Sequence, residues 1–501
     1  MNDHNFETVP DYLVLNYHLM HPGGDSAPGD PNLAYFLNNT YHLHYILRHP
    51  WTGSSAPAND AGRAFSFIHI TSPDMLHWTW QPTTLQPSFT GHGTFSGTGF
   101  VTNEGLPAAI YAGLSEPRHS FIAIAKDESL TQWEKPYALL PKDGPDDSDL
   151  KLLGDPDLFV IDNTYYIYSA GDNLELYRST DLQNWKHVGP FMQHDMQDVA
   201  KGEDISCANF FPLGNKWMLL CISHFIGCRY YIGEWDSETE QFVPETHGRM
   251  NWRRSDQSLI EPTHRDFFAP ESVLTGDGRR VMWAWLATTD PAIALKSVQS
   301  LPRELAIRDD GSLQIDPLKE LESLRYDQII LKDVVLNSKT GFTSGSFHSS
   351  EKIANLEGDS LELRVLIDRK EVNRKRLGLQ FFADEENDGL LLLLRPESGT
   401  ICLGDTEAPF RVSDLPHGEN LDIRIFIDKY LVEVFVNGRQ ALLRTFMEYR
   451  EAGNQLRGYV FGGTNNEDVT VLGRIDIWKM HATNLGFLEA RQNRIWEPNL
   501  S

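Results

Sequence analysis

The chain has 501 residues, and its 70 acidic side chains outnumber the 44 basic ones, giving a formal net charge of −26. This length exceeds one ordinary hydrophobic core, so two or three domains are expected. A negative field of this size repels phosphate backbones and anionic lipid, which argues against a nucleic-acid or membrane-surface partner. The 12 Trp, 17 Tyr and 26 Phe residues favour a neutral polar ligand, such as a sugar, instead.

Signals for membrane insertion and export are weak. The longest purely aliphatic run covers residues 390–394, far short of the ~20 residues of a membrane-spanning helix. Residues 1–15 lack a basic segment followed by an apolar one, and the four cysteines form no CxxC pair. We therefore expect a cytoplasmic protein without a disulfide framework, or a secreted one if a leader has been removed.

A short turn pattern, small–Asp–x–x–x–Trp, recurs in the first half of the chain. Its landmark aromatic residues are spaced by 55, 52 and 57 residues, and each copy follows a strand-like run. Such a period is typical of four-stranded propeller blades, and five units would end near residue 300. A β-sandwich with chance Trp spacing is the alternative. The copies lie at residues 72–78, 126–133, 179–185 and, more loosely, 235–242.

The sequence pattern changes after residue 301, and the Trp repeat does not return. Residues 317–325 have Leu at helical spacing, and alternating strands return from about residue 340, with a hairpin signal at Asn437-Gly438. The prediction is an all-β chain, a five-bladed β-propeller followed by a C-terminal β-sandwich. We expect the propeller over 1–315, a connector with a short helix over 316–338, and the sandwich over 339–501.

Five acids stand beside turn-forming or aromatic residues at the edges of predicted strands. The first strands of propeller blades converge on one axis, so acids near the ends of those strands come together in space. A proline after an aspartate also holds the backbone extended at the acid. One Asp-Pro pair is usually only a turn, but two in different blades indicate a site. The five acids are Asp30, Asp155, Glu203, Asp204 and Glu271.

These segments resemble glycoside hydrolase family 32, the invertases, inulinases and other β-fructofuranosidases. Residues 30–32 are similar to the Asp-Pro-Asn of its opening motif, residues 95–98 to its Phe-Ser-Gly-Ser motif, and residues 155–157 to the Asp-Pro of its Arg-Asp-Pro motif. The resemblance runs almost from end to end. Further similar segments are residues 268–272, 278–280, 283–285, 301–305, 319–321 and 432–437.

The resemblance implies retaining hydrolysis of β-fructofuranosides without a metal or an organic cofactor. Asp30 would be the nucleophile, and Asp155 would accept hydrogen bonds from sugar hydroxyls. The 18 histidines show no metal-ligand spacing with a matching acid. The other residues expected to line the substrate site are Asn32, Phe95, Ser96, Asp204, Ser206 and Glu271.

The chain departs from the family pattern at three places. Residues 27–29 replace the Trp-Met-Asn before the nucleophile, and Gly154 replaces the arginine of Arg-Asp-Pro. Most seriously, Ser206 stands at the acid/base position, and a serine cannot protonate a leaving alcohol at neutral pH. Three nearby carboxyls are therefore candidates for the acid/base, with Glu203 first, then Asp204 and Glu271.

Two further functions stay open at this stage. The altered motifs are compatible with a fructosyltransferase or a hydrolase acting on another furanoside. They are also compatible with a non-catalytic carbohydrate-binding propeller that has lost its acid. In each case the expected partner is a small fructoside or oligosaccharide, and the protein is expected to be a monomer or a homodimer.

Overall fold

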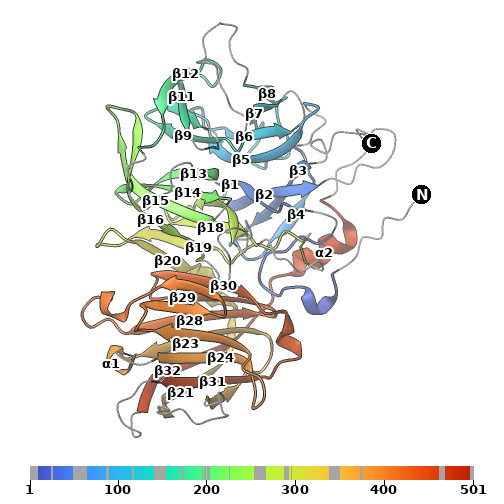
Figure 1. Cartoon of the computed structure of the whole chain (residues 1–501). Helices are drawn as coiled ribbons and strands as arrows, with labels where there is room; N and C mark the ends of the chain where they lie inside the picture. The colour runs from blue at the N-terminus through green and yellow to red at the C-terminus, as the bar shows by residue number, and fades with distance from the viewer. Residues whose placement is uncertain are drawn as a thin grey trace.

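The computed structural model describes residues 9–496, apart from a set of gaps. Strands dominate the described chain, in five four-stranded antiparallel sheets before residue 318 and two six-stranded sheets after it. Figure 1 shows the four-stranded sheets gathered at one end of the molecule and the six-stranded sheets at the other. The gaps are residues 24–25, 49–64, 86–89, 115–117, 140–153, 169, 172–173, 194–195, 197–198, 200–202, 225, 253–266, 287–292, 295, 338–349, 373–375 and 462–468.

The first three four-stranded sheets follow the chain in order. The first holds β1 (Pro31–Leu37), β2 (Thr40–Arg48), β3 (Phe65–Ser72) and β4 (Thr79–Gln81). The second holds β5 (Gly93–Val101), β6 (Pro107–Leu114), β7 (His119–Ile124) and β8 (Tyr137–Ala138). The third holds β9 (Asp157–Ile161), β10 (Thr164–Tyr168), β11 (Glu175–Ser179) and β12 (Lys186–Pro190).

Two more sheets of the same kind complete the set. The fourth holds β13 (Ser206–Leu213), β14 (Lys216–Ser223), β15 (Gly227–Asp236) and β16 (Gln241–Arg249). The fifth holds β17 (Phe268–Leu274), β18 (Arg280–Trp285), β19 (Arg303–Ile307) and β20 (Leu313–Pro317). The first strands touch in a closed ring, β1 with β5, β5 with β9, β9 with β13, β13 with β17, and β17 with β1. This is the arrangement of a β-propeller.

The repeated sequence pattern forms the turn between the third and fourth strands of a sheet. Asp74 accepts hydrogen bonds from the backbone N–H groups of Leu76 (3.0 Å) and His77 (2.8 Å). Asp181 repeats the motif, with Gln183 and Asn184 donating at 3.0 and 2.7 Å. The aspartate thus fixes the turn by satisfying backbone donors, which explains its regular spacing.

The second part of the chain forms the two six-stranded sheets. In spatial order, the first sheet contains β21 (Arg325–Asn337), β32 (Val469–Met480), β23 (Ser360–Ile367), β28 (Leu421–Asp428), β29 (Leu431–Val436) and β30 (Gln440–Thr445). The second contains β22 (Glu351–Asn355), β31 (Gln455–Phe461), β24 (Arg376–Ala383), β25 (Leu390–Arg395), β26 (Thr400–Leu403) and β27 (Thr406–Pro409). Asn437 and Gly438 both have positive φ in the turn between β29 and β30, which confirms the predicted hairpin.

Helices are few and short in the described chain. The predicted helix over 317–325 is a 3₁₀ helix, η4 (Lys319–Leu324), and α2 (Leu485–Asn493) returns to contact β4 of the first sheet (Figure 1). No helix among the described residues has the length and apolar character to cross a membrane. The remaining helical segments are η1 (Asp11–Leu13), α1 (Arg369–Val372), η5 (Val412–Asp414) and η6 (Met447–Arg450).

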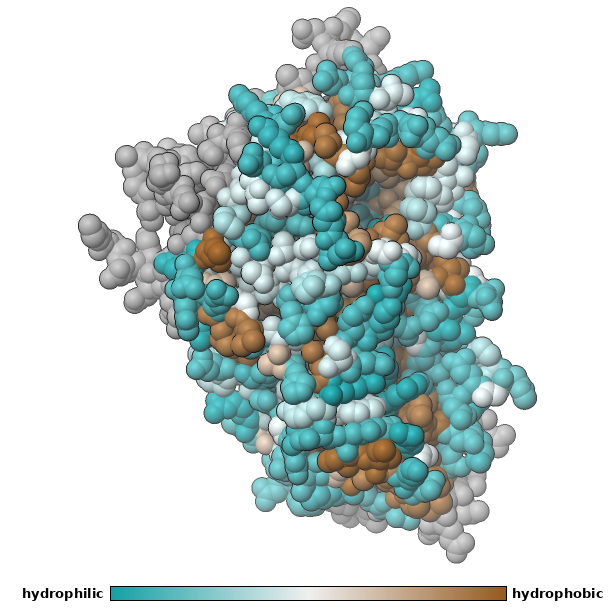
Figure 2. All heavy atoms as spheres, turned by 180° about the vertical axis from the view of Figure 1, so that it is seen from behind, coloured by the Kyte–Doolittle hydropathy of each residue, from teal (hydrophilic) through white to brown (hydrophobic). Residues whose placement is uncertain are grey.

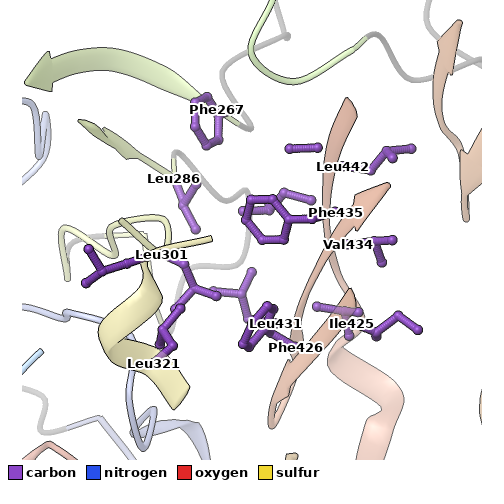
Figure 3. Packing of buried hydrophobic residues seen from close by; sticks show 14 of the residues in the cluster. Phe267, Leu286, Leu301, Leu321, Ile425, Phe426, Leu431, Val434, Phe435 and Leu442 are labelled. Carbon is purple, nitrogen blue, oxygen red and sulfur yellow. The ribbon is translucent and has the colours of Figure 1, made fainter. Parts of the chain in front are cut away.

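An apolar interface with a buried ionic core joins the ring to the sandwich. Figure 3 shows side chains from the ring, such as Phe267 and Leu301, facing Phe435 and its neighbours on the six-stranded sheet. Within this interface Arg303 donates to Glu433 at 2.8 Å, and both side chains are fully buried. Nδ1 of His18 lies 3.0 Å from Oδ2 of Asp428, so the segment before β1 also contacts the sandwich.

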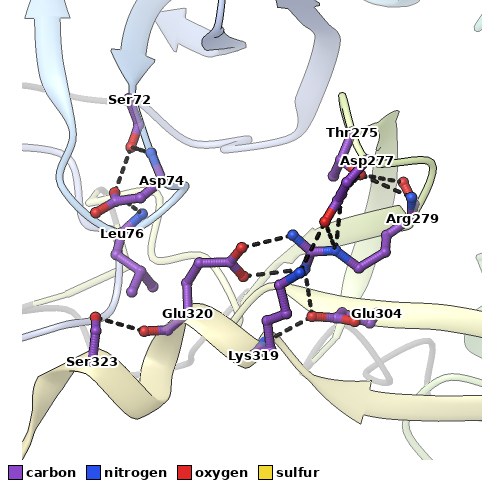
Figure 4. Close-up of polar contacts among 10 residues, drawn as sticks. All are labelled: Ser72, Asp74, Leu76, Thr275, Asp277, Arg279, Glu304, Lys319, Glu320 and Ser323. Carbon is purple, nitrogen blue, oxygen red and sulfur yellow. Dashed lines mark hydrogen bonds and ion pairs between the residues drawn. The ribbon is translucent and has the colours of Figure 1, made fainter.

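The connector helix is tied to the fifth sheet by polar contacts. Arg279 donates to Asp277, Glu304 and Glu320, and Lys319 contacts Asp277 at 2.8 Å (Figure 4). Away from these interfaces, the face in Figure 2 is largely hydrophilic with separate apolar patches, as expected for a strongly acidic chain.

Candidate active site

The starts of the first strands bring together two of the predicted acids. The thiol of Cys207 lies 3.9 Å from Oδ2 of Asp30 and 3.6 Å from Oδ2 of Asp155. The backbone N–H of Cys207 also donates to Oδ2 of Asp155 at 3.2 Å. Burial raises the pKa of the thiol well above its usual range, and the charges of the two aspartates raise it further. The neutral thiol therefore stands between two carboxylates as a hydrogen-bond donor.

An unusual backbone supports this arrangement. Asp155, Cys207 and Ala269 have φ of +28°, +44° and +45°, which is uncommon for residues with a Cβ. The register of β13 also shifts between Ser206 and Asn209, and comparable shifts occur near the starts of β1, β5 and β17. Such bulges re-aim side chains and often lie beside functional sites.

The nucleophile candidate is held by the segments around it. Asn32 donates to the backbone carbonyl of Asp30 at 2.6 Å and accepts from Gly97 N–H at 2.9 Å, which ties β1 to β5. The carbonyl of Gly29 accepts from Ser297 Oγ (2.9 Å) and Gln299 Nε2 (2.7 Å). A Cβ on Gly29 would lie 2.7 Å from the Ser297 Cα, so only glycine allows this approach.

A second polar cluster lies two residues further along the same strands. Glu271 on β17 accepts from Thr98 Oγ1 at 3.2 Å, and Thr98 in turn accepts from Asn209 at 3.3 Å. Asp157 accepts from the hydroxyl of Tyr168 and from the N–H of Phe210, both at 2.8 Å. The spacing by two follows from the strand period, which returns every second side chain to the same face.

Burial dominates the electrostatics of this second cluster. It raises the pKa of Asp157 to about 7 and that of Glu271 well above its usual range, with a smaller contribution to Glu271 from the nearby Asp157 charge. Arg280 of β18 is the cation near Glu271, and burial lowers its pKa to about 10. Its guanidinium also lies 4.2 Å from the ring centre of Phe211.

The first acid/base candidate, Glu203, lies just before β13. Its carboxylate accepts a hydrogen bond from the guanidinium of Arg229 on β15, and both side chains are largely buried. Arg229 also lies 3.0 Å from His247 Nδ1 and 4.8 Å from the ring centre of Tyr231. The carboxylate of Glu203 is therefore part of an ion pair with a fixed partner.

The carboxylate of the second candidate, Asp204, accepts hydrogen bonds from several donors. Ser206 Oγ and Ser223 Oγ both lie 3.3 Å from its carboxylate, and the N–H of His224 donates at 3.1 Å. Nδ1 of His224 lies 2.5 Å from Oδ2 of Asp204. Ser206, expected from the resemblance to stand at the acid/base position, thus contacts Asp204 and helps to hold it.

The other predicted site residues have different surroundings. Ser96 is buried beside the Cys207 thiol, whereas the half-buried ring of Phe95 packs against Phe65 at a centroid distance of 5.2 Å. Glu271 belongs to the second cluster and not to the level of Asp30. Cys207, Thr98, Asp157, Asn209 and Arg280 were not predicted as site residues, although alternation by two after the predicted Ser96 and Asp155 points to Thr98 and Asp157.

The comparisons with known proteins assign the chain to a family. The family model "Glycosyl hydrolases family 32 N-terminal domain" matches residues 26–317, and "Glycosyl hydrolases family 32 C terminal" matches residues 320–479. The ring of sheets with carboxylates at its axis is thus that of a glycoside hydrolase. The chain belongs to glycosyl hydrolases family 32.

Two curated relatives match nearly the whole chain. It is 28% identical to the raffinose invertase of Escherichia coli over 89% of this chain and 92% of that protein. It is 24% identical to the sucrose-6-phosphate hydrolase of the same organism over 93% of this chain and 94% of that one.

Solved structures of low identity share the fold. Fructan 1-exohydrolase IIa from Cichorium intybus aligns with a TM-score of 0.70 at 19% identity, covering 95% of this chain and 98% of its own. Sucrose-6-phosphate hydrolase from Lactobacillus gasseri aligns with a TM-score of 0.69 at 20% identity, covering 94% of both chains.

Proposed function

We propose that this protein is a retaining glycosidase that hydrolyses β-fructofuranosides of the sucrose, fructan or fructo-oligosaccharide type. The observation that carries the proposal is the pair of carboxylates, Asp30 and Asp155, on either side of the Cys207 thiol. The names of the relatives, an invertase and a sucrose-6-phosphate hydrolase, support the same substrate class.

We also propose the number of blades and the bounds of the two domains. The five four-stranded sheets are the blades of a five-bladed propeller, predicted over residues 1–315, and the last strand of the fifth sheet, β20, runs two residues beyond that bound. Residues 316–338 are a connector, and residues 339–501 are the sandwich. Strand β21, within the connector, pairs with β32 and so extends the sandwich sheet at its edge.

In the proposed reaction, Asp30 attacks the anomeric carbon and forms a fructosyl-enzyme ester. The hydrogen bonds from Asn32 and to Gly29 hold the Asp30 backbone, so the nucleophile needs little reorganisation. Asp155 accepts hydrogen bonds from sugar hydroxyls, which strengthen as positive charge develops on the ring. An acid/base group protonates the leaving oxygen and then deprotonates the attacking water.

The three carboxyl candidates for the acid/base differ in their surroundings. Glu203 is engaged by Arg229, and such an ion pair needs the ionised carboxylate, whereas a general acid must carry a proton. Glu271 is buried in the second cluster with Thr98 and Arg280. Asp204 is bound by Ser206, the residue directly before Cys207, and its carboxylate also lies 2.5 Å from Nδ1 of His224.

Product analysis on a panel of sugars tests the proposal. Sucrose, raffinose, 1-kestose, inulin, levan and a difructose anhydride are incubated with the protein, and released fructose is measured. We expect free fructose from at least one of the first five, initially as the β-anomer. A protein that binds these sugars but releases no fructose is a carbohydrate-binding propeller, and one that yields longer oligosaccharides instead is a fructosyltransferase.

A further inference from the structure

Ser206, which the resemblance places at the acid/base position, contacts the carboxylate of Asp204. Ser206 Oγ lies 3.3 Å from Oδ2 of Asp204, and that same oxygen lies 2.5 Å from Nδ1 of His224. Ser223 holds the other oxygen of the carboxylate at 3.3 Å. Two serines thus fix an aspartate whose strongest contact is an imidazole.

The histidine lies at the same end of the ring as the nucleophile candidate. β14 ends at Ser223, and its neighbour Ile222 pairs with Ser206 at the start of β13. His224 follows directly, one strand away from the Cys207 thiol that contacts Asp30. Its ring also meets the ring of Phe268, the first residue of β17, edge-on at 5.8 Å. The imidazole therefore lies where the fourth and fifth sheets meet.

We propose that His224, oriented by Asp204, is the general acid/base of the hydrolysis; this inference rests on the proposed function. Asp204 accepts a hydrogen bond from Nδ1–H of His224, which leaves Nε2 as the nitrogen that exchanges a proton with the substrate. Other carboxylate–histidine pairs assign the two ring nitrogens in the same way. The side chain of His224 is 48% exposed while that of Asp204 is 17% exposed, so the orienting carboxylate is sheltered and the ring is accessible.

The reaction balances with these groups alone. The Nε2 proton of His224 passes to the glycosidic oxygen as the bond from that oxygen to the anomeric carbon breaks and Asp30 bonds to the carbon. The alcohol leaves, and His224 is neutral. Nε2 then takes a proton from water as the water oxygen attacks the anomeric carbon, which releases fructose and restores both the Asp30 carboxylate and the charged imidazole.

A matched pair elsewhere in the chain separates this role from an ordinary surface contact. His77 and Asp74 lie 2.7 Å apart in the turn between β3 and β4, and the His77 side chain is also 48% exposed. Asp74 is held by Ser72 of the third strand, β3, and caps its own turn. His77→Asn is therefore the control for His224→Asn.

The test compares two substrates in full-length enzyme. Sucrose needs a protonated leaving group, whereas p-nitrophenyl β-fructofuranoside does not. We expect His224→Asn to lower kcat on sucrose about 10²–10⁴-fold and to leave fructosylation by the nitrophenyl substrate nearly unchanged. Azide should restore turnover of the nitrophenyl substrate and yield β-fructosyl azide. Asp204→Asn should show the same leaving-group dependence to a smaller degree, and His77→Asn should behave as wild type.

Other results overturn the inference. Wild-type activity of His224→Asn, or equal losses on both substrates without azide rescue, would remove His224 from proton transfer. The same leaving-group signature in Glu203→Gln would assign the role to Glu203. If the wild-type enzyme releases fructose and Asp30→Asn does not, these results reject only the histidine. If the wild-type enzyme hydrolyses no fructoside, the proposed function itself fails.

Discussion

At the junction between ring and sandwich, the buried carboxylates of Asp428 and Glu433 face His18 and Arg303, whereas at the ring axis Asp157 and Glu271 are buried close to each other. Burial alone would raise the pKa of both junction acids. The hydrogen bond from His18 to Asp428 and the charge of Arg303 near Glu433 outweigh burial, and both pKa values fall. The junction carboxylates are therefore held in their charged form by His18 and Arg303.

The axis has the opposite character. At the axis, burial outweighs the hydrogen bonds that lower the pKa, so the pKa values of Asp157 and Glu271 rise. The backbone beside them has left-handed residues and bulges, which cost free energy that only the surrounding sheets can offset. Perturbed acids and a strained backbone at one place are typical of functional sites. Substitutions at the axis should therefore change activity, and substitutions at the junction should change stability.

The largest effect is expected from Asp30→Asn, which keeps the shape of the side chain and removes the nucleophilic charge. Fructoside hydrolysis should fall on the order of 10⁴–10⁶-fold, while thermal unfolding stays close to wild type. Initial rates on sucrose and a thermal scan measure the two quantities. Retained turnover would move the nucleophile to another residue.

At the junction, Arg303→Met should leave the carboxylate of Glu433 buried without its guanidinium. Breaking such a pair lowers the free energy of unfolding by about 3–5 kcal/mol. The kcat of the folded enzyme should change little, since Arg303 donates to Glu433 and to the carbonyl of Met250, which lie outside the set of residues placed at the active site. The control is Arg376→Met at the exposed pair with Glu397, which should cost less than about 1 kcal/mol. Equal losses in both variants would contradict the contrast.

A smaller effect on activity is expected at the thiol between the two aspartates. Cys207→Ala removes the donor that both carboxylates share and should lower kcat/KM about tenfold. Cys207→Ser keeps a donor of similar size and should retain more activity than the alanine variant. The reverse order would show that the thiol acts by filling space and not by donating.

The last prediction concerns Asp157, whose folded pKa of about 7 lies above the usual value near 3.9. Between about pH 4 and pH 7 the unfolded form ionises first, so the wild-type folded state loses stability as the pH rises. Asp157→Asn lacks this loss. Its melting temperature relative to wild type should therefore be higher at pH 8 than at pH 4.5, and a pH-independent difference would contradict burial as the cause.

The sequence predicted the repeat because it has a local cause, and it also singled out Asp30, Asp155 and Glu271. The aspartate of the repeat satisfies donors only two or three residues away. Proline drew attention to Asp30 and Asp155, but the extended backbone expected before proline is wrong for Asp155, which has a φ of +28°. The helix at residues 317–325 was predicted from Leu spacing, but η4 is 3₁₀, with Glu320 bonded to Arg279.

The surroundings of the acid/base candidates could not be predicted in the same way. Arg229 pairs with Glu203 across 26 residues, and His224 reaches Asp204 across 20, because the β13–β14 and β14–β15 hairpins fold them back. The bulge after Ser206 also interrupts the alternation that would have identified Cys207 and Asn209. Such contacts follow from register, which the amino-acid pattern alone does not specify here.

The most direct test of the central claim is to trap the covalent intermediate and find the residue that carries it. His224→Asn enzyme is mixed with p-nitrophenyl β-fructofuranoside, quenched, digested and analysed by peptide mass spectrometry. We expect one hexosyl group on the peptide that contains Asp30 and none when Asp30→Asn is combined with His224→Asn. A hexosyl group on another carboxylate, or fructose release by wild-type enzyme with inversion and no adduct, would contradict it.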